Sequence, residues 1–255
     1  MEENYSFLAR SLGKLGFEDT LNGALRKKME EGQLSFELKA KINHGKDNMV
    51  HELQFERKKE SGYYFLQAQN VTLISEDKEL KQRFPFFNQT GFNNDETYNL
   101  MKGRAVLNNI RKEGQEITRW TYLDLKAPRN EKGNIVFRNP READLNFNLV
   151  KAVGNLPLQS LSEKEKEDLL KGLQQGNLME VTLRLNGRLE KAHLQADPVY
   201  SRVLVFNNQM EKITLSNSKI QVLEEEKKDL PDTTKKLMEK INDPKPDKEL
   251  KRKIG

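Results

Sequence analysis

One local layout recurs along the sequence and limits the folds that are open to it. In residues 24–38, and again in residues 169–183, an apolar helical pattern ends at a glycine, Gly32 or Gly176, and apolar and polar residues then alternate. Glycine favours a helix end because it readily adopts the left-handed conformation that closes the last turn. Period-two alternation is typical of a strand with one buried side. The layout predicts a helix packed on a small sheet, because neither element buries its apolar face alone.

The first copy of this layout is predicted over residues 16–75. Three apolar residues lie on one helical face and three more then alternate as in a strand: Leu21, Leu25, Met29, Leu34, Phe36 and Leu38. Turn-rich segments at 43–48 and 57–62 divide the residues that follow. We expect a helix and a three-stranded antiparallel meander.

The third copy, residues 161–221, has the clearest local signals. Ser162 and Glu165 have the spacing of a capping box, in which each side chain satisfies a free backbone donor of the first helical turn. Asn186 and Gly187 predict a tight hairpin, because both accept the positive φ of a type I′ turn.

The middle copy, residues 92–138, fits less closely, with Leu100 three residues before Gly103. Three matching layouts predict an internal duplication. The alternative left open is that helix-then-hairpin stretches occur in any α+β protein.

The remaining segments are predicted as connectors and a tail. Residues 1–15 form an N-terminal amphipathic helix, residues 76–91 a connector helix, residues 139–160 a second connector, and residues 222–255 a mobile charged tail. The predicted fold class is therefore α+β, with three tandem helix-plus-meander repeats, short connecting helices and a mobile C-terminal tail.

Composition and charge exclude several classes of protein. The net charge of +5 is a small difference between 44 basic and 39 acidic residues, and phosphate-driven binding needs a clustered excess. Cysteine is absent, which excludes disulfides and thiolate chemistry. The N-terminus lacks a secretory signal, and no stretch approaches the roughly 18 apolar residues that span a bilayer. We expect a cytoplasmic protein without membrane contact.

Segments of the middle and third copies resemble a family of uncharacterised proteins that are built from domain-of-unknown-function repeats and carried on bacterial conjugative and other mobile elements. The segments are "YNLMKGRAV", "EGQEITRWTYLDL", "EKGNIVFRN" and "LPLQSLSEKEKEDLLKGLQQGNLMEVTL". Recurrent residues of the family would stand at Gly103, Arg104, Ala105, Val106, Trp120, Leu123, Asp124, Gly133 and Asn134. The resemblance implies a setting in mobile-element biology and brings no catalytic residue.

Motifs of the common catalytic and cofactor sites are absent from the sequence. It has no phosphate-binding loop, no H-E-x-x-H pair and no G-x-S-x-G elbow. The three histidines, His44, His51 and His193, are not spaced as metal ligands. We therefore expect no cofactor, no metal and no enzymatic activity.

A metal-dependent nuclease is kept as a remote alternative. Asp124 and Lys126 have the acid-x-lysine spacing in which a carboxylate holds Mg²⁺ and a lysine steadies the attacking water. A second acidic ligand would have to converge on them. Asp95 and Glu96 are candidates, although acids are also expected at a helix start.

Nucleic-acid binding is the stronger alternative. The stretch "SGYYFLQA" is similar to the RNP1 strand of an RNA-recognition motif but lacks its leading basic and final aromatic residues. We expect Tyr63 and Phe65 to pack against the first repeat's helix instead.

The predicted binding site lies on the strand 117–125 and in the segment that follows. Alternation places Trp120 and Tyr122 on the opposite face from Leu123. If that face is open, an aromatic pair rimmed by cations suits a protein hot spot or a base-stacking platform. The candidate residues are Arg119, Trp120, Tyr122, Lys126, Arg129, Lys132 and Arg138. In the other interpretation, Trp120 is packed under a neighbouring repeat.

The sequence thus favours a non-catalytic binding protein with a protein partner. Weak, sequence-nonspecific nucleic-acid binding is the alternative, and the oligomeric state stays open.

Overall fold

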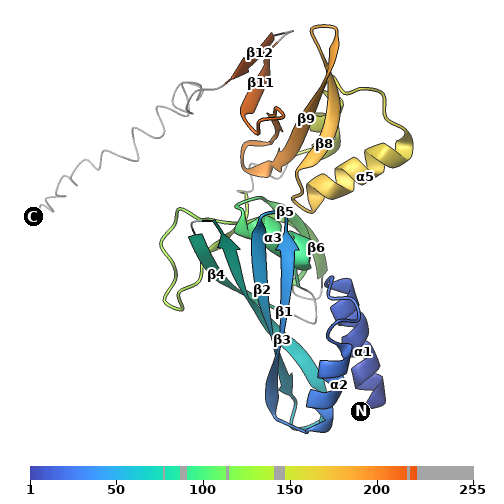
Figure 1. The fold of residues 1–255 in the computed structure, drawn as a ribbon, viewed down its shortest axis with the longest axis vertical. Coiled ribbons are helices and arrows are strands. Elements are labelled where there is room, and N and C mark those ends of the chain that lie inside the picture. Colours follow the sequence, from blue (N-terminus) through green and yellow to red (C-terminus); the bar gives the residue numbers. More distant parts are fainter. Residues whose placement is uncertain (77, 87–90, 113–114, 141–146, 217–218, 223–255) are drawn as a thin grey trace, which may run out of the picture.

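The computed structural model describes residues 1–76, 78–86, 91–112, 115–140, 147–216 and 219–222 (Figure 1). The described residues form an α+β fold with three antiparallel sheets, which confirms the predicted class. Strand order is β1-β2-β3-β4 in the first sheet, β5-β6-β7 in the second and β12-β11-β10-β9-β8 in the third. The predicted tail, residues 222–255, lies outside the described residues except for Val222.

The first sheet consists of β1 (Ser35–His44), β2 (Asp47–Arg57), β3 (Tyr64–Ser75) and β4 (Lys78–Pro85). Each strand pairs with its neighbour along the chain, and a bulge interrupts the β2–β3 register between Gln54 and Phe55. β2 alternates between buried and more exposed residues along most of its length, so one face of the sheet is buried and the other is polar.

Two helices, α1 (Glu2–Lys14) and α2 (Asn22–Glu30), cover one end of the buried face. The N-terminal helix is thus confirmed. Leu25 and Met29 of α2 are fully buried and pack in one cluster with Phe36 and Leu53 of the sheet. The predicted packing of Tyr63 is wrong, because Tyr64 enters this core at 3% exposure while Tyr63 is 49% exposed.

The predicted connector helix over residues 76–91 is wrong, because Lys78–Pro85 forms β4. Its buried positions are Gln82 and Phe84, with Leu80 partly buried, which is the period-two spacing of a strand. The charged residues Glu79, Lys81 and Arg83 alternate with them, whereas the helix was predicted from Ser75 as its first cap.

The second unit consists of α3 (Asn94–Met101), β5 (Val106–Lys112), β6 (Gln115–Leu123) and the short β7 (Phe137–Arg138). It covers the other end of the first sheet's buried face. Leu100 and Val106 are fully buried there in one cluster with Met49 and Val71 of the sheet.

The third unit contains α4 (Leu149–Gly154), α5 (Glu163–Gln174), β8 (Met179–Leu185), β9 (Arg188–Asp197), a 3₁₀ turn (Pro198–Tyr200), β10 (Arg202–Phe206), β11 (Lys212–Ser216) and β12 (Lys219–Val222). The capping box of Ser162 and Glu165 is confirmed. Asn186 and Gly187 have φ of 50° and 78° in the β8–β9 turn, as predicted. Three strands were predicted for each sheet, and this number holds for the second sheet alone.

The helix before each sheet ends in the same way. Gly32, Gly103 and Gly176 have φ of 69°, 75° and 82°, in the region that glycine adopts without strain. Each donates its backbone N–H to the carbonyl three residues earlier. A common glycine end therefore follows α2, α3 and α5.

Candidate functional site

Trp120, the centre of the predicted binding site, is half-buried at the junction of the second and third units. Its ring lies 5.8 Å from that of Phe147 and packs against the apolar cluster of the third unit. Three residues further along the same strand, on its other face, Leu123 is buried in the cluster that faces the first sheet. The two faces of β6 thus contact different units.

The cations of the predicted site are spread over the segment after β6. Lys126, Arg129, Lys132 and Arg138 are exposed, and Arg119 and Tyr122 are half-buried. Arg129 donates hydrogen bonds to the carbonyls of Lys81 and Gly133, so it holds the segment against β4. Among the described residues, no cation–π contact joins these cations to the ring of Trp120, and binding there stays a prediction.

Asp124, the acid of the nuclease alternative, has a structural environment. Its Oδ1 accepts hydrogen bonds from the backbone N–H groups of Lys126 and Ala127, and its Oδ2 lies 3.6 Å from Arg138. Glu96 is held in the capping box of α3, where it accepts the N–H of Asn93. Within the described ranges, no group of three or more histidine, aspartate or glutamate side chains is arranged to hold a metal ion.

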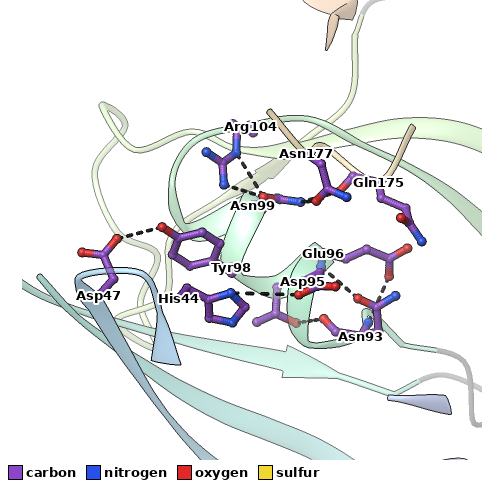
Figure 2. Close-up of polar contacts among 11 residues, drawn as sticks. His44, Asp47, Asn93, Asp95, Glu96, Tyr98, Asn99, Arg104, Gln175 and Asn177 are labelled. Carbon is purple, nitrogen blue, oxygen red and sulfur yellow. Dashed lines mark hydrogen bonds and ion pairs between the residues drawn. The ribbon is translucent and has the colours of Figure 1, made fainter. Parts of the chain in front are cut away.

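A network of polar side chains surrounds α3 where the three units meet (Figure 2). Tyr98 donates a hydrogen bond of 2.8 Å to Asp47, which also accepts one of 3.0 Å from Lys102. The ring of His44 stacks on Tyr98 with centroids 4.2 Å apart, and the guanidinium of Arg104 lies 5.2 Å from the centre of the same ring. The turn between β1 and β2 is thereby fixed to α3.

Asn99 extends this network to the third unit. The side chain is 2% exposed and donates hydrogen bonds to the carbonyl of Gln175 and to the side chain of Asn177, at 2.7 and 2.6 Å. Its own oxygen accepts from Arg104. Each polar atom of this buried amide is therefore satisfied across the junction.

The pKa values in this network are shifted mainly by burial. Burial lowers the pKa of His44, although nearby Asp95 opposes the shift. Burial and the hydrogen bond to Asp47 raise the pKa of Tyr98. Both side chains are engaged by neighbours within the network. We therefore interpret the network as a joint between units.

A surface hollow lies between α1, β3, α3 and β5. It has a volume of about 660 Å³, within the range of about 300 to 1,000 Å³ that is usual for ligand sites. Apolar side chains form much of its lining: Phe7, Leu8, Leu15, Leu66, Phe86 and Leu107. Leu8, Leu15 and Leu66 are buried, so they form a fixed floor.

A smaller hollow of about 300 Å³ adjoins the first along α1. Phe7 lines both hollows and is 39% exposed. Beside it, the side chain of Asn4 bonds both the N–H and the C=O of Tyr64, taking the place of a neighbouring strand at the start of β3. We call the two hollows together the α1 groove.

The charged side chains of the α1 groove are mainly basic on its rim. Arg10 and Lys14 are exposed in the last turns of α1, and Lys58 lines the smaller hollow. Glu96 lies in the wall, where burial raises its pKa. Asn108 and Asn109 add amides on the opposite side.

Sequence reasoning did not identify this groove. Arg10 and Lys14 carry no motif, and the lining residues come from segments separated by up to about 100 positions. The one available signal was Phe7, an aromatic residue in an amphipathic helix.

Comparison of the chain with protein-family models, with curated proteins and with solved structures found no match. Among the helices of the described part, none combines the length and the apolar composition needed to cross a bilayer.

Proposed function

We propose that this chain is a non-catalytic binding protein that holds an extended, acidic and apolar segment of a protein partner in the α1 groove. The observation that carries the proposal is that Phe7, an exposed aromatic side chain, lines both hollows. An exposed aromatic side chain between an apolar floor and a basic rim has the composition of a protein hot spot.

The length of the groove supports a peptide as its occupant. Its α1 residues extend from Glu3 to Lys14, which corresponds to about 17 Å along a helix. An extended peptide covers this distance in about five residues. The apolar floor accepts alternate side chains, as in other grooves that bind extended segments.

Charge supports an acidic partner. Arg10, Lys14 and Lys58 face the groove from its rim, against the acids Glu3 and Glu96. The three basic side chains outnumber the two acids, and the carboxylate of Glu96 already accepts the N–H of Asn93. Carboxylates of the partner would meet Arg10 and Lys14 while its apolar side chains contact Phe7 and Phe86.

The remaining expectations complete the proposal. Three copies of one helix-plus-meander unit, supported by the shared glycine ends after α2, α3 and α5, form a rigid scaffold for the groove. The resemblance to mobile-element proteins suggests that the partner acts in maintenance or transfer of such an element, in the cytoplasm.

The proposal is tested with a display library of random peptides that is selected against the full chain. We expect the selected peptides to be enriched in acidic and large apolar residues. Phe7→Ala should weaken their binding about tenfold or more, because the truncated side chain is a central contact. The double variant Arg10→Glu, Lys14→Glu should weaken peptide binding more than Phe7→Ala does. Added salt should weaken peptide binding by the wild-type chain moderately.

The matched control is Lys27→Glu, which reverses an exposed charge on α2 outside both hollows. It should leave peptide binding unchanged. Selected peptides that bind Phe7→Ala and the double variant as tightly as wild type would overturn the proposal. Tight binding of single-stranded DNA or RNA that is lost in Lys126→Glu, Lys132→Glu, with no acidic peptide selected, would favour the nucleic-acid alternative instead.

A further inference from the structure

Two outer strands of the sheets are covered by other segments of the chain. Along β4, the backbone N–H of Arg83 donates to the side chain of Asn134, and the carbonyl of Lys81 accepts from Arg129. Along β8, Gln159 donates its backbone N–H to Thr182. Such cover blocks the free backbone groups that would otherwise pair with another chain.

β1 is an outer strand on which the described residues place no such cover. The carbonyl of Leu34 accepts the N–H of Arg57, and the register with β2 is continuous, so even-numbered residues turn their backbone groups to β2. The N–H and C=O groups of Glu37, Lys39 and Lys41 therefore point outward. Among the described residues, no hydrogen bond reaches β1 from this side.

An exposed apolar side chain lies at the start of the same edge. Leu34 is 64% exposed, although it continues the alternation of the buried Phe36 and Leu38. The side chain stands on the apolar face of the sheet with no neighbour beyond β1 to cover it. A strand added to this edge would bring such a neighbour.

We propose that two copies of this chain pair antiparallel through β1, with the twofold axis beside Leu38. In this register Glu37 lies opposite Lys39 of the second copy, twice by symmetry. On the apolar face Leu38 meets its own equivalent and Leu34 lies opposite Ile42. The two four-stranded sheets then form one continuous sheet whose free edges at β1 are closed.

The charges along β1 select this register over its neighbours. A twofold axis beside Lys39 places the two Lys39 side chains opposite each other, and an axis beside Ala40 sets Lys39 against Lys41. Like charges directly opposite destabilise a strand pair. The axis beside Leu38 gives opposite charges at Glu37 and Lys39 and leaves Lys41 beside the small Ser35.

The dimer surface is separate from the α1 groove. α2 contacts β1, whereas α1 contacts β3, so the groove lies toward the other side of the sheet. The failure of one proposal therefore leaves the other untouched.

Charge reversal tests the pairing by sedimentation equilibrium on the full chain. Glu37→Lys alone and Lys39→Glu alone each place like charges opposite one another, and each should weaken dimerisation about tenfold or more. A mixture of the two variants restores both opposite-charge pairs and should form a heterodimer of near wild-type affinity. Thermal unfolding checks that each variant folds.

Cysteine cross-linking tests the register, because the native chain has no cysteine. Paired strands bring Cα atoms to about 5.5 Å, within disulfide range. A mixture of Glu37→Cys and Lys39→Cys should cross-link under oxidation, while neither variant should cross-link alone.

The variant Lys39→Pro removes one backbone N–H that points outward from β1 and leaves the hydrogen bonds to β2 intact. It should abolish the dimer. A wild-type chain that is monomeric at every attainable concentration overturns the proposal, and so does a dimer that persists in Lys39→Pro. Cross-linking of either cysteine variant alone, without the mixed product, overturns the register.

Discussion

The hydroxyl of Tyr98 donates a hydrogen bond of 2.8 Å to the carboxylate of Asp47, and this contact fixes the turn between β1 and β2 to α3. Burial alone would raise the pKa of Asp47, but hydrogen bonds from Ser75, Lys102 and Tyr98 lower it. The carboxylate is therefore stabilised in its charged form at the junction between the first and second units.

Removing the hydroxyl of Tyr98 should destabilise the fold. Tyr98→Phe leaves Asp47 with one donor fewer, which we expect to cost about 1.5 kcal/mol in the free energy of unfolding because the acceptor is charged. Urea denaturation measures the change. Tyr63→Phe is the control, since Tyr63 is 49% exposed and should change stability by less than about 0.5 kcal/mol. Equal losses of stability in Tyr98→Phe and Tyr63→Phe would contradict a stabilising role for the hydrogen bond from Tyr98 to Asp47.

Asn99 should couple the third unit to the second. Asn99→Ala removes the donor to the half-buried carbonyl of Gln175 and one acceptor of Arg104, at a cost of about 2 to 3 kcal/mol. Amide hydrogen exchange should show faster opening in α5 and β8 than in β1–β3. The control Asn43→Ala changes an exposed amide in β1. If the amides of all three sheets lost protection from exchange to the same extent, Asn99 would not act as a local joint between the second and third units.

Three glycine substitutions should separate backbone strain from steric clash. Gly176→Ala should be the most destabilising, by about 3 kcal/mol, because its φ is +82° and an added Cβ would lie 2.8 Å from the carbonyl oxygen of Ala105. Gly187→Ala meets no atom within 4 Å and should cost about 1 kcal/mol for its φ of +78°.

The third member of the series is Gly23→Ala in α2, which has an ordinary helical conformation and open space around the added Cβ. It should stabilise the protein by about 0.5 kcal/mol, because alanine loses less backbone entropy. Thermal unfolding orders the three variants. A loss of stability in Gly176→Ala no greater than that in Gly187→Ala would be evidence against the close packing of the α5 end on the start of β5.

His51 should make the stability depend on pH. It is fully buried, and burial lowers its pKa from 6.5 to about 4, despite a hydrogen bond with Gln69. As the pH falls, the unfolded chain takes up the proton first. The stabilisation is complete above pH 6.5 and is lost progressively down to about pH 4, for a total of about 3 kcal/mol.

Urea denaturation at several pH values measures this dependence. His51→Asn retains a donor toward Gln69 and removes the titrating group, so its stability should vary less between pH 6.5 and pH 4 than that of wild type. Parallel curves for the two proteins would exclude His51 as the source.

Sequence reasoning predicted the features that short-range signals determine. The capping box of Ser162 and the Asn186-Gly187 turn depend on residues within a few positions of each other, so their chemistry is readable from the sequence alone. β4 was missed because one of its buried positions is the polar Gln82, whose side chain bonds Ile135, a residue 53 positions away. No local pattern identifies that partner.

The α1 groove was beyond sequence reasoning for the same reason. Phe7, Leu66 and Leu107 contribute to it from three separate elements, and each resembles an ordinary apolar residue in its own segment. The predicted site at Trp120 came from local alternation, which showed that β6 has a second face but not that Phe147 lies against it.

The most direct test of the proposed function is an NMR titration of the labelled full chain with an acidic, apolar peptide from the display selection. Amide signals of Phe7, Leu66 and Leu107 should shift in a saturable way, and the shifts should disappear in Phe7→Ala. Saturable shifts confined to the segment from Lys126 to Lys132 or to Trp120, with the groove residues unchanged, would contradict the account.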